Sequence, residues 1–318
     1  MKIVIETEFF GRNLAEELSE SIPGADFVAA FDTEVLKREI VDADAVVGWP
    51  SADVCLTASR LRWIHVPGMG IDAVLTNPAL AESDVMVTNS PGPHTNPIAD
   101  HVMYFILSLA HNGREMMDDQ HARRWDPDKY RRRMIELNGS VMGLLGIGGI
   151  GRAVAQRAAA FGMELYAVDP SPTDIPAGVR EVWGLERLDE MLGMTDWLVV
   201  AAPVNTDTRN LIDARRLGLL RPSSYVIVIS RGGIVDEMAL AEALQKGSLA
   251  GAGIDATAVE PLPSDSPLWG FQNVLISPHN SGDSPSLWTG RRRIIEDQVR
   301  RFVEGRPLAF ICSLERGY

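Results

Sequence analysis

Short apolar runs alternate with amphipathic segments along the first ninety residues of the chain. The runs rich in β-branched residues predict strands, and the segments with helical spacing predict helices between them. The predicted strands are residues 2–5, 26–30, 45–49, 63–66 and 85–88, and the predicted helices are residues 12–21 and 33–41. Strands that alternate with helices in this way form a small parallel α/β unit.

A second alternating pattern begins at Val141. Its predicted strands are residues 141–145, 164–168, 196–201, 225–229, 250–254 and 274–276. Short strands alternating with helices over this length are typical of a doubly wound parallel sheet. Between the two patterns, a Pro and Gly cluster at residues 90–97 predicts a hinge, and an apolar segment predicts a helix over residues 98–114.

The last predicted helix carries clear end signals. Ser284 is placed to cap it, Pro285 takes its first position and Gly305 ends it. The helix is long enough to return to the first unit, and its apolar face consists of Leu287, Ile294, Ile295, Phe302 and Val303.

A glycine-rich turn directly follows the first strand of the second pattern. Its residues are Gly146, Ile147, Gly148, Gly149, Ile150 and Gly151. A backbone without Cβ can approach a pyrophosphate there, and the free N–H groups of the next helix face the phosphate charge. That helix, predicted at residues 152–161, ends at Gly162. The strand and helix at these distances favour a dinucleotide site over an ordinary glycine turn.

Asp169 lies at the carboxyl end of the next predicted strand and indicates which dinucleotide binds. Its carboxylate can accept hydrogen bonds from both ribose hydroxyls of the adenosine half and would repel a 2′-phosphate. We therefore expect NAD rather than NADP as the cofactor. A loop aspartate before Pro170 is the alternative that the sequence leaves open.

The glycine-rich turn lies in the middle of the chain, which sets the expected domain order. We expect a Rossmann-type, NAD-binding doubly wound sheet at residues 98–282. It is inserted into a smaller, flavodoxin-like parallel α/β domain formed by residues 1–97 and 283–318, which we expect to bind the substrate. A cleft between the two would let substrate meet cofactor.

The formal net charge of −13 disfavours nucleic acid as a partner, because phosphate neutralisation needs a basic face. The basic residues that do cluster are interrupted by Asp126 and Asp128, which favours a solvated or subunit-contacting loop. They are Arg123, Arg124, Lys129, Arg131, Arg132 and Arg133. An anionic substrate would have to be held by local donors that outweigh this overall acidity.

Cysteine usage and hydropathy favour a reduced, cytoplasmic setting. Cys55 and Cys312 lie far apart, and the first residues do not resemble a signal segment. The longest apolar run, near residues 102–110, is too short to span a bilayer, so we expect no membrane partner. The metal-binding patterns Cys-x-x-Cys and His-Glu-x-x-His do not occur, and no metal site is predicted.

Three predicted strands of the second pattern each lead into a loop with one candidate catalytic residue. These residues are Arg231, Glu260 and His279. Each alone could be a structural arginine, a solvated acid or a surface histidine. In an open parallel sheet, however, ligands bind outside the carboxyl ends of the strands, so the three side chains can point at one site.

The three side chains suit reduction of a 2-oxo acid by hydride. The reaction needs a proton donor at the carbonyl oxygen, a cation that orients the substrate, and a carboxylate that keeps the donor protonated. We assign His279 as the general acid and base, Glu260 as its partner, and Arg231 as the clamp on the substrate carboxylate and carbonyl. On this assignment Arg231 and His279 contact both substrate and cofactor.

Several motifs in order along the chain resemble the D-isomer-specific 2-hydroxyacid dehydrogenase family. They are residues 68–72, 89–92, 146–151, 203–209, 231–237, 255–263 and 277–279. In this family Arg, Glu and His form the catalytic set. The resemblance also implies that the backbone N–H groups of Met69 and Gly70 hold the substrate carboxylate. It further implies that Asp255 meets the nicotinamide carboxamide and that Ala202, Pro203 and Ser230 line the cofactor channel.

The sequence departs from the family pattern at several positions that bear on the expected substrate. Val228 stands where the family often has asparagine, and Asn280 stands where it has a small residue. Formate dehydrogenases of this superfamily have glutamine at the position of Glu260, so formate oxidation is disfavoured. The ending Arg316-Gly317-Tyr318 resembles the short glyoxylate/hydroxypyruvate reductase-like branch, for which we expect no appended regulatory domain.

The resemblance predicts a homodimer, with the helix near Ile98 and the loop around Trp125 as the subunit contact. A phosphoglycerate-type dehydrogenase is the alternative substrate class, although no basic cluster accompanies the Gly68 loop in the sequence. An NAD(H)-sensing, corepressor-like binding protein is the alternative from a different class. The candidate pocket walls are Trp49, Met69, His94 and Trp288, and core packing explains the two tryptophans at least as well.

Overall fold

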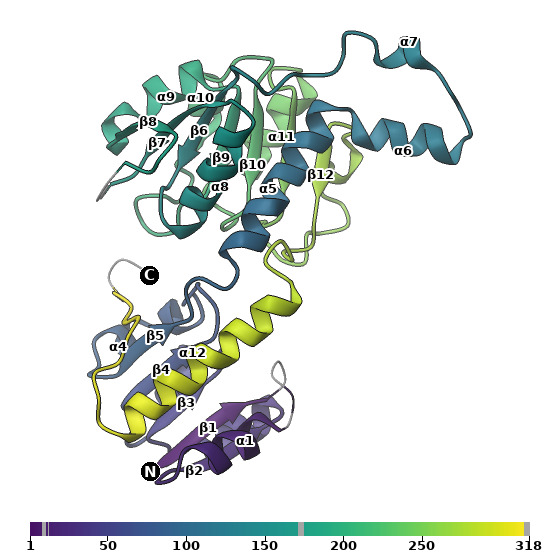
Figure 1. Cartoon of the computed structure of the whole chain (residues 1–318). Coiled ribbons are helices and arrows are strands. Elements are labelled where there is room, and N and C mark those ends of the chain that lie inside the picture. The colour runs from purple at the N-terminus through teal and green to yellow at the C-terminus, as the bar shows by residue number, and fades with distance from the viewer. Residues whose placement is uncertain (8–10, 12, 171–174, 315–318) are drawn as a thin grey trace. The chain divides into compact units, whose positions relative to one another are not determined.

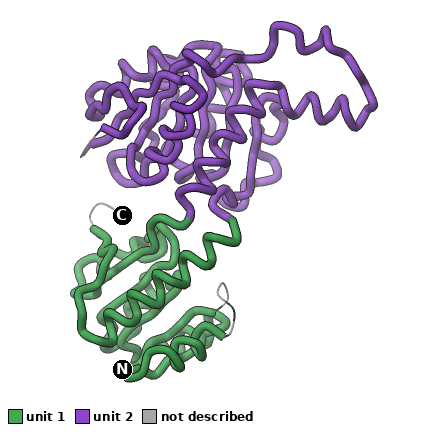
Figure 2. Tube along the Cα trace, in the orientation of Figure 1, with its two compact units in different colours: residues 1–93, 284–318 green, residues 94–283 purple. Residues whose placement is uncertain are grey.

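The computed structural model describes the chain except residues 8–10, 12, 171–174 and 315–318. The described chain divides into two compact units, one of residues 1–93 and 284–318 and the other of residues 94–283 (Figure 2). The first boundary lies earlier than expected because the helix after the hinge begins at Thr95 rather than Ile98. Arg12 and the ending Arg316–Tyr318 lie outside the described residues.

The first unit is built on a five-stranded parallel sheet in the order β2-β1-β3-β4-β5. This is the flavodoxin-like strand order, as predicted. The strands are β1 (Lys2–Glu6), β2 (Asp26–Ala30), β3 (Ala45–Val47), β4 (Trp63–Val66) and β5 (Met86–Asn89). All five were predicted from their apolar runs, with ends that differ by at most two residues.

Helices cover both faces of this sheet. They are α1 (Leu14–Ser21), α2 (Thr33–Glu39), α3 (Ala52–Cys55), η1 (Val74–Thr76), α4 (Pro78–Ala81) and α12 (Pro285–Val303). Side chains of α1 and α12 share one apolar core, and those of α2 to α4 share the other. The predicted ends of α12 are confirmed, since Ser284 accepts a hydrogen bond from Leu287 N and Gly305 has φ +67°.

The second unit is built on a seven-stranded parallel sheet in the order β12-β11-β10-β9-β6-β7-β8. Its strands are β6 (Val141–Leu145), β7 (Glu164–Val168), β8 (Val179–Trp183), β9 (Trp197–Val200), β10 (Tyr225–Val228), β11 (Gly251–Ile254) and β12 (Val274–Ile276). The order changes direction at β6, as in a doubly wound sheet. Because all strands are parallel, their carboxyl ends meet at one edge.

One strand of this sheet, β8, was missed by the sequence analysis. Its residues Arg180 and Glu181 are exposed, and it pairs only with β7 at the edge of the sheet. An edge strand buries little of its surface, so its sequence has a weak apolar pattern.

Two layers of helices sandwich the seven-stranded sheet (Figure 1). One face packs against α5 (Thr95–Ala110) and α8 (Gly149–Ala160). The other face packs against η2 (Leu185–Arg187), α9 (Leu188–Met194), α10 (Ala214–Leu217), α11 (Glu237–Gln245) and η3 (Pro267–Gly270). The predicted class of two parallel-sheet α/β domains is confirmed.

The helix predicted over residues 98–114 extends too far at its carboxyl end, since α5 ends at Ala110. Asn112 adopts the left-handed conformation with φ +57°, which ends α5 and starts a new helix, α6 (Gly113–His121). With α7 (Pro127–Tyr130), α6 forms an arm that extends from the body of the second unit (Figure 1). Asparagine tolerates this conformation better than most residues, which makes the turn possible.

A buried carboxylate, Asp119, holds this arm together. It accepts hydrogen bonds from Lys129 Nζ at 2.7 Å, Tyr130 Oη at 2.6 Å and Arg124 Nε at 2.9 Å. These donors, Lys129 first, lower the pKa of Asp119 to about 2. The basic cluster seen in the sequence is therefore partly neutralised within the arm.

Along the described part of the chain, no helix is both long and apolar enough to cross a membrane. The same residues contain no group of three or more His, Cys, Asp or Glu side chains arranged to hold a metal ion. Cys55 and Cys312 are buried free thiols whose pKa values are raised by burial.

The core of the first unit contains a fully buried histidine, His65, at the centre of a polar chain. Its Nδ1 lies 2.8 Å from Thr88 Oγ1, which also accepts the indole N–H of Trp63 at 2.9 Å. Its Nε2 lies 3.1 Å from Ser90 Oγ. Complete burial disfavours the charged imidazolium and lowers the pKa of His65 to about 3.

His65 should make the stability of the protein fall with decreasing pH. The folded protein keeps it neutral to about pH 3, whereas the unfolded chain takes up a proton near pH 6.5. The contribution of His65 to the free energy of unfolding is therefore fully present above pH 6.5. Below pH 6.5 it falls by up to about 1.4 kcal/mol per pH unit. Urea unfolding at pH 7, 6 and 5 measures this slope. His65→Gln, which keeps polar groups but cannot titrate, should lose it; equal slopes in both proteins would contradict the prediction.

Candidate active site

The glycine-rich turn connects β6 to α8 and has the shape that a dinucleotide needs. Gly146 has φ +95°, and a Cβ there would come within 2.8 Å of Ala202 N in the loop after β9. A Cβ on Gly151 would collide with the carbonyl oxygen of Gly146. Only glycine fits these two positions, because the turn, the start of α8 and the β9 loop are packed backbone against backbone.

Gly148, by contrast, faces open space, which leaves room for a phosphate at the turn. A Cβ on Gly148 would meet no atom within 4 Å, and Gly148 is the N-cap of α8. The first N–H groups of a helix are unpaired within it and attract anions. The residues present therefore fit a pyrophosphate approaching the turn.

Asp169 lies beside the same turn. Its Oδ2 accepts a hydrogen bond from Ile147 N at 3.0 Å, and its own N–H donates to the Trp183 carbonyl at 2.9 Å. These contacts fix Asp169 at the end of β7 and hold its carboxylate next to the glycine-rich turn. The structure thus brings together the glycine-rich turn, predicted to bind phosphate, and the acid predicted to bind ribose.

The loop after β10 contains a second feature that suits a cofactor. Ser230 Oγ is buried and has no hydrogen-bond partner among the described residues. A buried hydroxyl without a partner costs free energy unless a ligand or water supplies one. Of the other predicted channel residues, Ala202 is buried and Pro203 is exposed.

The three candidate catalytic residues follow three neighbouring strands. Arg231 follows β10, Glu260 follows β11 and His279 follows β12. The register pairs Val228 with Ile254, and Ile254 with Ile276, so these strands end level with one another. The candidate residues therefore begin from one edge of the sheet.

His279 and Glu260 form a hydrogen-bonded pair. His279 Nδ1 lies 2.8 Å from Glu260 Oε2 and 3.0 Å from Oε1, and the side chains are 39% and 40% exposed. Since a carboxylate only accepts, Nδ1 carries the proton and Nε2 is the nitrogen left for proton exchange. Thr257 N donates to Glu260 Oε1 at 3.0 Å and fixes the carboxylate.

The backbone of His279 adopts a left-handed conformation. Its φ is +50°, a value that few non-glycine residues adopt, and its N–H donates to the Ser277 carbonyl at 3.0 Å. Such a conformation costs about 1 kcal/mol and persists only where surrounding contacts impose it. Strain of this kind concentrates at functional sites.

Arg231 is placed by the close packing of two loops. A Cβ on the next residue, Gly232, would collide with the backbone of Thr257 and Ala258. Glycine at this position lets the Arg231 loop lie directly on the Glu260 loop. The guanidinium Nη1 of Arg231 donates to the Ser230 carbonyl at 2.8 Å.

Asp255, predicted to meet the carboxamide, also anchors the histidine turn. It is 2% exposed. Its Oδ1 accepts hydrogen bonds from Ser277 Oγ at 2.6 Å and from Asn280 N at 3.1 Å, and Ser281 N donates to its two oxygens at 3.2 Å. Residues on both sides of His279 are therefore tied to one carboxylate at the end of β11.

Two neighbours of this site were not assigned by the sequence analysis. One is Ser277, whose hydroxyl bridges to Asp255. The other is Glu237, which accepts a hydrogen bond from Ala258 N. Burial, and to a smaller extent the nearby Glu260, raise the pKa of Glu237. Its position in the motif after Arg231 was the available signal.

The predicted carboxylate-binding residues lie in the first unit. Asn89 Nδ2 donates to the Met69 carbonyl at 2.9 Å, and Ser90 N donates to the Gly68 carbonyl at 2.9 Å. Among the described contacts, the N–H groups of Met69 and Gly70 donate to nothing. These bonds fix the loop by its carbonyls and leave its amides for a ligand.

The four candidate pocket walls do not all belong to one unit. Trp49, Met69 and Trp288 belong to the first unit, and His94 belongs to the second. Trp49 lies against the loop of Gly68 to Gly70, since a Cβ on Gly68 would come within 3.4 Å of its Nε1.

Comparison with known proteins identifies the family. Residues 103–281 match the model of the D-isomer specific 2-hydroxyacid dehydrogenase, NAD binding domain. This stretch covers more than half of the chain and contains the glycine-rich turn and all three candidate catalytic residues. The chain belongs to the D-isomer specific 2-hydroxyacid dehydrogenase family and has its NAD-binding domain.

Individual relatives differ in their substrates. A D-3-phosphoglycerate dehydrogenase from Methanocaldococcus jannaschii is 29% identical over 92% of this chain and 56% of its own length. An (S)-sulfolactate dehydrogenase from Chromohalobacter salexigens is 34% identical over 84% of this chain and 82% of its own. The chain spans about half the length of the phosphoglycerate dehydrogenases that it matches.

A solved structure is similar over the whole chain. It is an NADPH-dependent glyoxylate/hydroxypyruvate reductase from Sinorhizobium meliloti, in complex with NADP and sulfate. The TM-score is 0.84 at 26% identity, and the match covers 100% of this chain and 99% of that one. The fold and the order of its elements are therefore those of the family.

Proposed function

We propose that the protein is an NAD-dependent oxidoreductase that interconverts a small 2-oxo acid and its (R)-2-hydroxy acid. The observation that carries the proposal is the His279–Glu260 pair, with 2.8 Å between Nδ1 and Oε2, on the same sheet edge as the glycine-rich turn. An imidazole held by a carboxylate on the same sheet edge as a dinucleotide turn suits a proton donor for hydride chemistry.

Each residue has a defined part in the reaction. NADH, when bound, supplies the hydride that adds to the carbonyl carbon. His279 Nε2 gives its proton to the carbonyl oxygen, and Glu260 stabilises the imidazolium before that transfer. Arg231 orients the substrate carboxylate and polarises the carbonyl. The amides of Met69 and Gly70 are the further proposed carboxylate donors, which work whatever the net charge of the protein.

A glyoxylate- or hydroxypyruvate-like substrate is favoured, because the similar reductase structure matches over the whole chain. A phosphorylated 2-oxo acid is the second candidate, and one observation favours it. Arg291, distant in sequence, lies 5.8 Å from the ring centroid of Trp49, the side chain beside Gly68. The structure thus adds a cation that the sequence analysis did not associate with this loop.

The proposal predicts reduction of 2-oxo acids that depends on His279. NADH consumption should be measured with glyoxylate, hydroxypyruvate, pyruvate, phenylpyruvate, oxaloacetate and 3-phosphohydroxypyruvate. His279→Gln should lower kcat/KM by roughly 100-fold or more, since a positioned general acid contributes about that much. His111→Gln, at an exposed position after α5, is the matched control and should keep full activity.

The coenzyme comparison is part of the same experiment. Because Asp169 would repel a 2′-phosphate, NADH should be preferred to NADPH. A large NADPH preference would overturn that assignment. Binding of NADH without turnover of any 2-oxo acid would instead favour the dinucleotide-sensing alternative.

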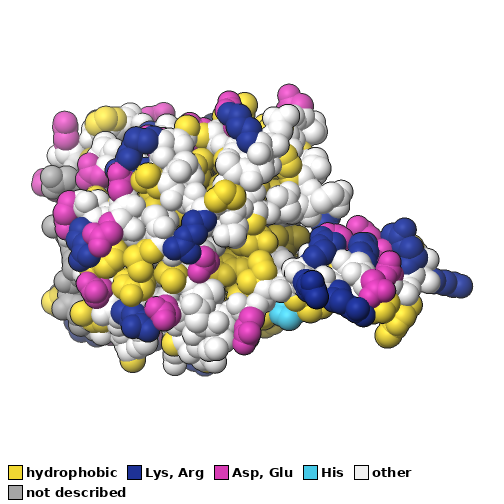
Figure 3. Space-filling view, turned by 90° about the horizontal axis from the view of Figure 1, so that it is seen from above, with side chains coloured by type: hydrophobic (Ala, Val, Ile, Leu, Met, Phe, Trp, Pro, Cys, Tyr) yellow, Lys and Arg dark blue, Asp and Glu magenta, His cyan; other side chains and the backbone are white. Residues whose placement is uncertain are grey.

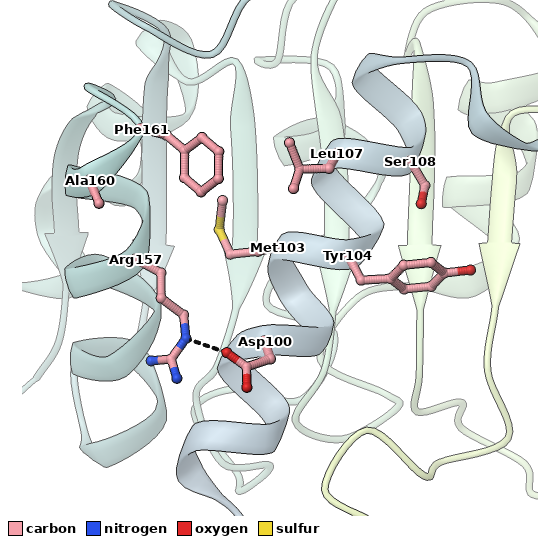
Figure 4. A pocket seen from close by; sticks show the side chains of 8 residues that line it. All are labelled: Asp100, Met103, Tyr104, Leu107, Ser108, Arg157, Ala160 and Phe161. Carbon is pink, nitrogen blue, oxygen red and sulfur yellow. Dashed lines mark hydrogen bonds and ion pairs between the residues drawn. The ribbon is translucent and has the colours of Figure 1, made fainter.

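We also propose that the protein forms a homodimer through the outer face of α5 and α8 and through the arm. A groove between these helices is lined by Met103, Leu107 and Phe161, with an Asp100–Arg157 ion pair at one end (Figure 4). The groove is mainly apolar, which is typical of a surface that another chain covers.

The arm adds exposed apolar side chains to this surface. Trp125 is 95% exposed and Met117 is 60% exposed. Seen from above, the arm extends sideways with hydrophobic atoms among its charges, and hydrophobic atoms also gather on the neighbouring body (Figure 3). A tryptophan exposed to this degree is costly in water and suits a partner surface.

Sedimentation at micromolar concentration should therefore give about 70 kDa, twice the chain mass of 34.8 kDa. Phe161→Arg should shift the protein towards the monomer, because a buried charge without a partner opposes association. Met238→Arg places the same charge on α11, on the other face of the sheet, and should leave the dimer intact. A wild-type monomer would contradict the proposal.

A further inference from the structure

A chain of hydrogen bonds runs from α5 to the candidate active site within the second unit. His101 Nε2 lies 3.0 Å from Ser277 Oγ, and Ser277 Oγ lies 2.6 Å from Asp255 Oδ1. The residues come from α5, the segment after β12 and the end of β11. They are up to 176 positions apart in sequence, so no sequence pattern reveals the connection.

The direction of these bonds follows from the donors available. A carboxylate only accepts, so Ser277 gives its single hydroxyl proton to Asp255. Ser277 Oγ then has no proton left for His101 and must accept from His101 Nε2–H. The hydrogen bond therefore defines the protonated nitrogen of His101, and the donor group is required at this position.

Packing holds His101 in this orientation. Its ring meets Phe105 edge-on at 4.5 Å between centroids and lies 5.4 Å from Tyr104. A Cβ on Gly253 of β11 would come within 2.7 Å of the Phe105 ring, so the missing Cβ lets α5 lie close to the sheet. Partial burial lowers the pKa of His101, partly offset by the Asp255 carboxylate.

The last residue of this hydrogen-bonded series is Asp255, which is predicted to meet the nicotinamide carboxamide. Asp255 Oδ1 accepts hydrogen bonds from Ser277 Oγ, Asn280 N and Ser281 N, whereas among the described residues Oδ2 accepts only from Ser281 N, at 3.2 Å. Oδ2 keeps acceptor capacity for an amide N–H. Oδ1 is bound to the two ends of the turn that contains His279.

We infer that His101 is a positioning residue for the nicotinamide end of the cofactor. Through Ser277 it sets the orientation of the Asp255 carboxylate, so that Oδ2 faces the carboxamide and the His279 turn stays in place. The inference rests on the proposed function. A residue that only packed α5 on the sheet would influence all parts of the cofactor equally, and this difference can be measured.

The test compares NADH with ADP-ribose, which has the same phosphates and adenosine but no nicotinamide. His101→Phe keeps an aromatic ring against Phe105 and removes the donor. It should weaken NADH binding roughly five- to tenfold, as expected for loss of one hydrogen bond in a chain to a charged group. Its affinity for ADP-ribose should stay within about twofold, which also shows that the variant is folded.

Two further variants separate the donor from the ring. His101→Gln keeps an N–H near the position of Nε2 and should restore NADH binding. Ser277→Ala removes the bridging hydroxyl and should raise the ratio of the NADH and ADP-ribose dissociation constants as His101→Phe does. His111→Phe, the same change at an exposed position just after α5, should alter neither affinity.

The outcomes distinguish this inference from the proposed function. Equal weakening of both ligands by His101→Phe, an unchanged ratio, or no rescue by His101→Gln would overturn the positioning role. A wild-type protein that binds neither NADH nor ADP-ribose would contradict the proposed function itself. Titrations by NADH fluorescence and by calorimetry provide both affinities without any need for turnover.

Discussion

The parallel direction of all seven strands in the second unit is the constraint on which the candidate site depends. Parallel strands place every following loop at one edge, so residues far apart in sequence begin side by side. The glycine-rich turn, Asp169, Arg231 and the His279–Glu260 pair all follow strands of this sheet. The absence of Cβ atoms at Gly146 and Gly232 then lets neighbouring loops pack backbone against backbone.

Local electrostatics, rather than net charge, makes the site suitable for anions. The chain carries a net charge of −13, yet the start of α8, the Arg231 guanidinium and the His279 ring lie on this edge. Asp255 and Glu260 are acidic residues at this edge, and each accepts a hydrogen bond from a backbone N–H group. Fixed donors and charges of this kind stabilise a reacting group without reorganising during the reaction.

The features predicted from sequence are those that depend on local patterns. The strands came from apolar runs, the ends of α12 from Ser284 and Gly305, and the cofactor turn from its glycine spacing. The His279–Glu260 pair could be anticipated because both residues follow strands of the same predicted sheet. The family resemblance supported these predictions through several motifs in order.

The features that were missed depend on tertiary contacts. The edge strand β8 lacks a clear apolar pattern. The break at Asn112 is the exception, because the Asn112-Gly113 pair is a local turn signal, which the apolar residues before it outweighed in the prediction. The approach of Arg291 to Trp49 and the chain from His101 to Asp255 join distant segments. No spacing rule in a single sequence reports such contacts.

The most direct test of the central claim is a double-mutant cycle on kcat/KM for the 2-oxo acid that is reduced fastest. It uses His279→Gln, Glu260→Gln and the double variant. If Glu260 acts through His279, the double variant should match His279→Gln within about threefold, because removing the partner of an absent imidazole costs nothing more. Losses that simply multiply would contradict the account, since the two side chains would then act independently.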